Sequence, residues 1–455
     1  MTAMRSLHAA ARALPLFLAL PASAFFSALP AQVAPTAGEP AREITLDDAI
    51  RLAQQNAPAL VQARGSLRSS AAGVRRAYAA FVPNLNTSIS SGRSAGATYF
   101  QGALVPLRGD AWSFSNSISA NVEVYDGGRR MSEVRRTKAV ETAAEASERT
   151  QLYNTALNVK QQYFNGLAAR ELEAAALRQL EQAEQQMAAS TARVRAGAAT
   201  KSDSLRSVIQ VGNARLAVLT ARNNLEVANA GLTRLVGTEF VVTPTPGDTV
   251  APPPVVLENQ ALVALLDQAP ALQQAQADLA AARAALKTAR AAWLPSLSAS
   301  YSFSANQSSG GFEPGNLFLF GGQNPNNKRL NFNISYPLFN QLQRETSITQ
   351  AQVTQRNAEA TLRDARLAAQ QTLTQALGTL RLAEERASIQ DASVAAAEED
   401  LRVQTQRYQL GAATLLDVLT SQTTLIQART ALIQARYDSR VAKAQLEALI
   451  GQELP

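Results

Sequence analysis

The stretch SFSNSISANVEVY, residues 113–125, alternates apolar and polar side chains, with Asn116 as the one polar residue at an apolar position. Strict alternation gives a β-strand one apolar face and one polar face. Three further stretches repeat the pattern: residues 84–90, 297–306 and 330–336. Runs of roughly 9–12 residues also match a tilted strand that crosses a lipid bilayer.

Two interpretations of these strands compete. One is a soluble antiparallel sheet with one face in water, and the other is a sheet with a polar lumen face and an apolar lipid face. The polar face is almost wholly serine and asparagine, and the connections are long on one side only (residues 92–111 and 307–328), which favours the second. In lipid, open sheet edges leave backbone groups unpaired, so the strands must close into a barrel. Small barrels have about eight strands, so several chains must contribute their strands to one barrel.

Residues 1–31 are typical of a secretory signal peptide. Arg5 and Arg12 precede a nearly continuous apolar run at 13–29, and small residues follow at 22–24 and at Ala31. Two prolines interrupt the short apolar run, which argues against a retained membrane helix. We therefore expect an exported protein, with the cleavage position left open between these two sites.

The composition excludes most kinds of catalytic and metal-binding site. The chain has no cysteine, and its single histidine, His8, lies in the predicted signal peptide. The mature chain then has no thiolate nucleophile, no imidazole base and no usual zinc ligand. We predict no enzyme activity, no cofactor and no metal site. The net charge of +7 falls to +5 when the two signal-peptide arginines are removed, and it is spread along the chain, so no nucleic-acid partner is expected.

The chain is an internal duplication. APAL at 57–60 recurs at 269–272, and FVPNL at 81–85 matches WLPSL at 293–297, both at an offset of 212 residues. RVRAGAATKSD at 193–203 matches RYQLGAATLLD at 407–417 at an offset of 214. We predict a first structural repeat at 32–237, a proline-rich linker at 238–256 and a second repeat at 257–455.

Each repeat has the same predicted order: a helix of about 35 residues, two strands, a very long helix, a GAAT turn and a helix of about 37 residues. The long helices span 128–195 and 343–410, roughly 100 Å each at the helical rise. The shorter helix of each repeat carries a heptad seam, namely Val211, Ala214, Val218, Ala221, Leu225, Ala228, Leu232 and Leu235, and Leu425, Ala428, Leu432, Ala435, Ser439, Ala442, Leu446 and Leu449. We expect helices 46–80 and 200–236 to stack end to end along one long helix.

These features resemble the TolC-type outer-membrane efflux channel family over essentially the whole mature chain. The resemblance rests on the paired APAL and PxL blocks, on YDGG at 125–128 and on RYQLGAATLLDVLTSQTTLIQARTALIQARY at 407–437. It implies a mainly α fold with a small β part. Three chains would close a 12-stranded β-barrel in the outer membrane above a long coiled-coil α-helical tunnel that extends into the periplasm.

The resemblance also implies a function and partners. The homotrimer would be a passive conduit from periplasm to exterior in a tripartite efflux or type I secretion system. It would contact a periplasmic adaptor (membrane fusion) protein and an inner-membrane pump of RND, ABC or MFS type. The alternative is a periplasmic adaptor or coiled-coil scaffold without a pore, which would not need four strands of bilayer length. Drug, metal and protein cargo all remain open.

Family roles carry over to particular residues. The turns Gly197, Ala198, Ala199, Thr200 and Gly411, Ala412, Ala413, Thr414 correspond to periplasmic tips that contact the adaptor. Asp417 and Thr420 correspond to a pore constriction, with threonine where the family has its second aspartate. Asp203 and Tyr408 correspond to a pair that locks the closed state, and Ala413 stands where the family has a further arginine.

Structural roles are the alternatives for these positions. A glycine suits the left-handed turn that ends a helix. Asp417 suits the first turn of a helix, where the dipole favours a carboxylate. Tyr408 suits ordinary helix packing.

Overall fold

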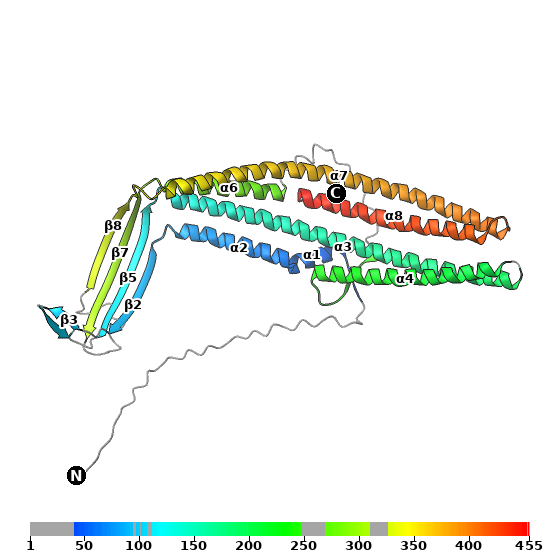
Figure 1. Ribbon diagram of the computed structural model, residues 1–455, viewed down its shortest axis with the longest axis horizontal. Helices are drawn as coiled ribbons and strands as arrows, with labels where there is room; N and C mark the ends of the chain where they lie inside the picture. The colour runs from blue at the N-terminus through cyan, green and yellow to red at the C-terminus, as the bar shows by residue number, and fades with distance from the viewer. Residues whose placement is uncertain are drawn as a thin grey trace, which may run out of the picture.

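A computed structural model describes residues 41–93, 97–100, 102–106, 112–197, 199–246, 269–309, 326–452 and 454. The predicted signal peptide and the part of the predicted linker after residue 246 lie outside these ranges. The molecule is elongated, with a sheet at one end and long helices running away from it (Figure 1). The two GAAT turns lie at the end farthest from the sheet.

The sheet contains the four predicted strands. β2 (Asn84–Arg93), β5 (Trp112–Tyr125), β7 (Ser296–Ser309) and β8 (Asn326–Ser335) are antiparallel neighbours in the order β2-β5-β7-β8. The pairing of β5 with β7 joins the two repeats.

The strand register confirms the two-faced sheet, because directly opposed residues share a face. One row across the sheet reads Ser88, Ser117, Ser304 and Asn327. A row on the other face reads Leu85, Ala120, Tyr301 and Leu330. The hydroxyls of Ser88 and Ser117 also share a hydrogen bond of 2.7 Å, which links β2 to β5 on the polar face.

Two β features differ from the sequence prediction. β8 begins at Asn326 rather than at Leu330, because pairing with β7 extends it through four polar residues that show no alternation. The long connection expected at 92–111 also contains a hairpin, β3 (Ala97–Phe100) and β4 (Ala103–Pro106).

The helices follow the duplication closely. α3 (Arg129–Arg195) and α7 (Gln343–Gln409) have 67 residues each, and α4 (Lys201–Val236) and α8 (Leu415–Ile450) have 36 each. α2 (Pro58–Ala79) and α6 (Pro270–Ala291) have 22 each. The second repeat's two extra residues therefore lie between the proline after α6 and the start of α7, in the strand pair and its connections.

The short helices stack along the long ones as predicted. α2 and α4 follow one another along α3, and α6 and α8 follow one another along α7 (Figure 1). The predicted 46–80 helix is broken into α1 (Leu46–Asn56) and α2 at Ala57, whose ψ is 121°. Pro58 causes the break, because a proline disfavours the helical conformation of the residue before it and fits the first turn of a new helix.

The predicted heptad seams form the core. Every seam position in α4 and α8 is buried or half-buried. A larger cluster, at the level where α1 meets α4, includes Tyr163, Leu232 and Tyr437 from α3, α4 and α8. The parallel pair β1 (Arg42–Ile44) and β6 (Val242–Pro244) contributes to it, and the Tyr163 hydroxyl donates to the Ile44 carbonyl over 3.2 Å. The short strands were not predicted from the sequence.

Candidate functional site

The two tip turns have matching backbones. Gly197 has φ +75° after α3, and Gly411 has φ +77° after α7. A residue with a side chain is strained in this left-handed conformation, so the structural reason for both glycines is clear. Ala199, Ala412 and Ala413 lie in the same turns, whereas Ala198 lies outside the described residues.

Each tip turn ends in a capping box. The Thr200 hydroxyl accepts from the Asp203 backbone N–H over 3.3 Å, and the Asp203 carboxylate accepts from the Thr200 N–H over 3.1 Å. Thr414 and Asp417 repeat this at the start of α8, at 3.3 Å and 2.8 Å. Reciprocal bonds of this kind fix the first turn of a helix, so both aspartates hold the tips in shape.

Asp417 is exposed beside the tip. Hydrogen bonds from the Thr414 backbone and hydroxyl hold the pKa of the Asp417 carboxyl below its usual range, with a smaller contribution from Arg407. It is therefore a fixed negative charge at neutral pH. Thr420 lies one turn further on, exposed, and its hydroxyl donates to the Leu416 carbonyl over 2.9 Å.

Tyr408 lies under a cation that comes from the other repeat. The Arg193 guanidinium lies 4.7 Å from the centre of the Tyr408 ring, so the last turn of α3 contacts the last turn of α7. Within the described ranges, no hydrogen bond joins Tyr408 to Asp203. The sequence analysis did not single out Arg193. The signal was present, because Arg193 aligns with Arg407 at the start of the two matching GAAT blocks, which places an arginine at each tip.

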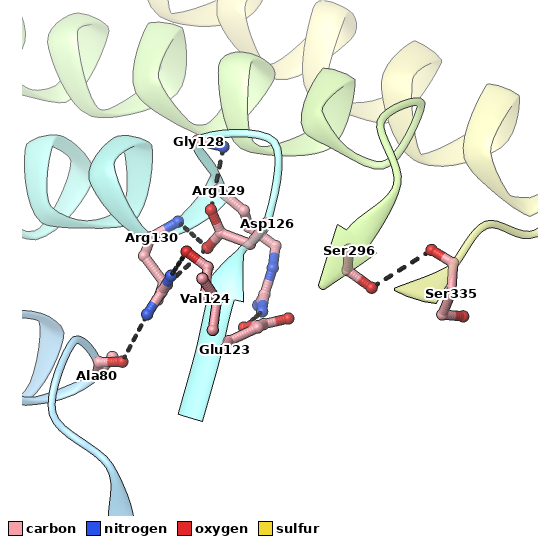
Figure 2. A network of polar contacts seen from close by, with 9 residues as sticks. All are labelled: Ala80, Glu123, Val124, Asp126, Gly128, Arg129, Arg130, Ser296 and Ser335. Carbon is pink, nitrogen blue, oxygen red and sulfur yellow. Dashed lines mark hydrogen bonds and ion pairs between the residues drawn. The ribbon is translucent and has the colours of Figure 1, made fainter. Parts of the chain in front are cut away.

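At the sheet end, each second strand turns into a long helix at an elbow. In the first elbow, residues 126–130, the Asp126 carboxylate accepts from the backbone N–H groups of Gly128 and Arg130 over 3.0 Å and 2.8 Å. It also pairs with the Arg130 guanidinium over 2.9 Å (Figure 2). Arg130 further donates to the carbonyls of Ala80 and Val124.

The Asp126–Arg130 pair is almost enclosed. The two side chains are 7% and 10% exposed. Burial raises the pKa of the Asp126 carboxyl, but the N–H groups of Arg130 and Gly128 and the guanidinium outweigh it, and the net pKa lies below the usual range. The first elbow is therefore held by an ionised, fully bonded pair.

The second elbow, residues 340–344, has the same path with different residues. Gln341 and Leu342 have φ of +57° and +62°, where the first elbow has two glycines at +67° and +82°. Arg344, 6% exposed, lies over the Trp293 ring at 4.2 Å and donates to the Leu338 carbonyl. Its Nε and Nη1 atoms have no hydrogen-bond partner. Asn340 stands where the first elbow has Asp126.

Two polar links fasten the repeats together between α3 and α8. Lys160 and Glu447 form an ion pair of 2.6 Å, with side chains 17% and 10% exposed. The Tyr437 hydroxyl donates to Glu171 over 2.7 Å, and burial together with this carboxylate raises the pKa of Tyr437. Shielded polar links of this kind stabilise a protein more than surface ion pairs do. These two contacts therefore help to hold the two repeats together.

A groove of 1210 Å³ lies between the two halves, bordered by α3, α4 and α8. Its lining is mostly alanine, glutamine and asparagine, including Gln162, Asn165, Gln182, Gln422 and Gln434. The groove offers mainly neutral hydrogen-bonding groups and small apolar side chains, with Arg178 and Arg429 as its two charged residues.

Two kinds of feature are absent from the described ranges. None of the helices there has a segment long and apolar enough to span a bilayer. Nor do three or more acidic, histidine or cysteine side chains gather there as a metal site would require.

Comparisons with known proteins agree with the duplication and the fold. Residues 49–238 and 261–452 each match the sequence model of the outer membrane efflux protein family. The chain is 29% identical over 351 residues to protein CyaE of Bordetella pertussis, covering 75% of this chain and 70% of CyaE.

One further relative and one solved structure extend the comparison. The pyoverdine export outer membrane protein OpmQ of Pseudomonas aeruginosa is 28% identical over 414 residues, 89% of this chain and 83% of OpmQ. A crystal structure of CusC superposes with a TM-score of 0.77 at 22% identity, covering 90% of this chain and 92% of CusC, which shows the fold. Proteins of the TolC type lie in the outer membrane and extend into the periplasm, and this chain has the same location. Because the family model covers most of both repeats, the chain belongs to the outer membrane efflux protein family, of the TolC type.

Proposed function

We propose that this chain is one protomer of a passive outer-membrane channel in a tripartite efflux or type I secretion system. The conduit runs from the periplasm to the exterior. The observation that carries the proposal is the sheet, which is joined at one end to helices of 67 residues. One face is mostly serine and asparagine, with Glu123 and Arg329 as charged exceptions, and the other is mostly apolar, with Lys328 opposite Phe303.

The proposed assembly is a homotrimer with a 12-stranded barrel. In the described part of the chain, β2 pairs only with β5 and β8 only with β7. Both outer edges need a partner in lipid. Pairing β8 of one protomer with β2 of the next repeats the internal β5–β7 junction head to tail, and such a contact can close into a ring. Three protomers of four strands supply enough strands for a barrel with a lumen.

The helices support the same ring. Of the 67 residues in each long helix, 15 are buried in α3 and five in α7. The two helices are equivalent in the repeats, but α3 also packs against α6 and α8 of the other repeat and against α1 and β6. The exposed α7 lies at the side of the molecule where the next protomer's first repeat would pack.

The tips are proposed to contact the periplasmic adaptor, with an inner-membrane pump of RND, ABC or MFS type beyond it. Three leucines near the turns, Leu205, Leu410 and Leu416, are 55%, 84% and 54% exposed. Exposed apolar side chains around a turn suit a protein partner.

The gate assignments remain proposals at the same tips. Asp417 and Thr420 would ring the constriction, and Asp203 and Tyr408 would lock the closed state. The Arg193 guanidinium over Tyr408 supplies a cation at a tip where Ala413 stands in place of the family's arginine. Asp203 also caps α4, so it has two roles in this proposal.

Planar-bilayer recording of the purified protein, with its native mass in detergent, tests the proposed function. We expect a trimer that produces discrete conductance steps. A monomer without conductance would contradict the proposal and would favour a scaffold without a pore.

A further inference from the structure

The starting point is an arginine that occupies the same place in both elbows. The Arg130 guanidinium lies 4.7 Å from the centre of the Phe81 ring, and the Arg344 guanidinium lies 4.2 Å from the centre of the Trp293 ring. In each arginine, Nη2 also donates to the carbonyl of the residue six positions earlier, over 3.4 Å and 3.2 Å. The ring and carbonyl partners are equivalent in the aligned repeats, so the two guanidinium groups are held alike.

The two arginines differ in what their remaining nitrogen atoms bind. Arg130 donates from Nε to the Asp126 carboxylate over 2.9 Å, and from Nη1 to the Ala80 carbonyl over 3.2 Å. The same two atoms of Arg344 are buried and have no hydrogen-bond partner. Arg344 as a whole is 6% exposed, so the second elbow contains an enclosed positive charge with an incomplete set of bonds.

The backbone around Arg344 is also arranged for an anion. In the first elbow, the Asp126 carboxylate accepts from the N–H groups of Gly128 and Arg130. The equivalent N–H groups of Leu342 and Arg344 lie at the start of α7, and no carboxylate in the described part of the chain accepts from them. The start of a helix favours negative charge through such groups and through the helix dipole. The second elbow therefore keeps the anion-binding groups of the first and lacks the anion.

The place of the second elbow in the molecule indicates the class of anion. It lies where the sheet meets the long helices (Figure 1), which is the edge of the bilayer in the proposed function. Leu338, Phe339 and Leu342 belong to the same segment and are 85%, 76% and 60% exposed. Exposed apolar side chains suit an acyl chain, and a guanidinium suits the phosphate group of a headgroup.

We propose that the second elbow binds a phosphate group through the Arg344 guanidinium and the N–H groups of Leu342 and Arg344. The phosphate takes the place that the Asp126 carboxylate fills in the first elbow. A phospholipid headgroup and free phosphate both carry this group. The lipid source rests on the proposed function, and the binding groups themselves do not. Asn340 is half-buried at the position equivalent to Asp126, so its side chain must turn outward to admit the phosphate.

Glu345 is the acidic residue in the first turn of α7. Its Oε2 atom is buried without a partner, and within the described residues no ion pair joins it to Arg344. The equivalent residue in the first repeat is Met131, so Glu345 is not the counterpart of Asp126. Its charge opposes a bound anion, and its removal should strengthen phosphate binding.

Trp293 can report on this site, because Arg344 lies over its ring. The chain has two tryptophans, so Trp112→Phe leaves Trp293 as the single one. This protein, purified in a maltoside detergent, is titrated with dihexanoyl phosphatidylglycerol, with inorganic phosphate, and with dihexanoylglycerol, which has no phosphate. In the same background, Arg344→Gln removes the guanidinium and Asn340→Asp supplies an internal carboxylate. Glu345→Gln is the matched control.

We expect phosphatidylglycerol to change the Trp293 emission in a saturable way and dihexanoylglycerol to leave it unchanged. Arg344→Gln and Asn340→Asp should each weaken phosphatidylglycerol binding by about tenfold or more, because charge-assisted bonds to the phosphate are lost or taken by the carboxylate. Glu345→Gln should bind at least as tightly as its parent. Weaker binding of inorganic phosphate would assign the site to a headgroup, and equal binding would assign it to free phosphate.

Two results would overturn the site. One is equal binding with and without the Arg344 guanidinium. The other is a trimer that conducts but binds neither phosphate probe, as expected if a carboxylate of a second copy fills the site. Both would leave the proposed channel standing. A monomer without conductance that binds phosphate through Arg344 would refute the channel and support the site.

Discussion

The two elbows of the molecule follow one backbone path with opposite local chemistry. The first has Asp126, Gly127 and Gly128, and the second has Asn340, Gln341 and Leu342. A left-handed backbone costs a residue with a side chain about 1–2 kcal/mol, and a buried arginine without a carboxylate loses charge-assisted bonds. The second elbow follows the same backbone path despite both of these costs. The strand and the long helix therefore impose the elbow's shape, and the local residues set how stable it is.

The largest effect is expected when the first elbow loses its carboxylate. Asp126→Asn leaves the Arg130 guanidinium buried without an acidic partner, which should destabilise the protein by about 3 kcal/mol. The change is measured by urea unfolding of the protein in detergent. Asp48→Asn is the matched control, because its carboxylate pairs with Arg51 at the surface, where such pairs contribute little. Equal losses of stability in both variants would show that the enclosed pair contributes no more than an exposed pair.

The same variant has a pH signature. The folded-state pKa of Asp126 is lowered from 3.8, so its stabilisation is complete above that value and is lost as pH falls through the lower folded pKa. The stability gap between wild type and Asp126→Asn should therefore close only below about pH 3.8.

The next effect tests the close contact at the first elbow. Gly127→Ala adds a Cβ atom against Leu294 and a strained φ, and should cost about 2–3 kcal/mol in the same urea titration. Gly128→Ala has a φ of +82° but no atom within 4 Å of the added Cβ, so only about 1 kcal/mol is expected. A larger loss for Gly128→Ala would contradict the described packing.

A gain is expected when the second elbow receives the missing carboxylate. Asn340→Asp should stabilise the protein by about 1–2 kcal/mol, because Arg344 then gains a charge-assisted partner. The gain should vanish in an Arg344→Gln background, which lacks the guanidinium. A gain of the same size in both backgrounds would mean that helix-terminus charge alone is responsible.

The smallest effect concerns the strained φ of the second elbow. Leu342→Gly removes the left-handed penalty but increases the entropy of the unfolded chain, so a net gain of about 0.5 kcal/mol is expected. Leu342 is 60% exposed, so little packing is lost. A clear loss of thermal stability would indicate that its side chain is a contact of the assembled protein.

Periodic features of this fold could be predicted from the sequence, and unique contacts could not. The alternating strands, the equal long helices and the heptad seams follow from side-chain spacing. The start of β8 depends on its neighbour β7, and the pairing of β1 with β6 joins two three-residue strands far apart in sequence. The Arg193–Tyr408 contact depends on how two helix ends approach each other, which no local pattern encodes.

The central claim is that the apolar face of the sheet lies in lipid and the polar face lines the pore. Tyr301 and Ser300 are neighbours in β7 on opposite faces, and both lie in rows without charged residues. An arginine facing the bilayer midplane costs roughly 2–4 kcal/mol. We therefore predict that Tyr301→Arg sharply reduces the yield of folded protein in the outer membrane, while Ser300→Arg assembles normally. Equal yields, or a greater loss for Ser300→Arg, would contradict the assignment of the two faces.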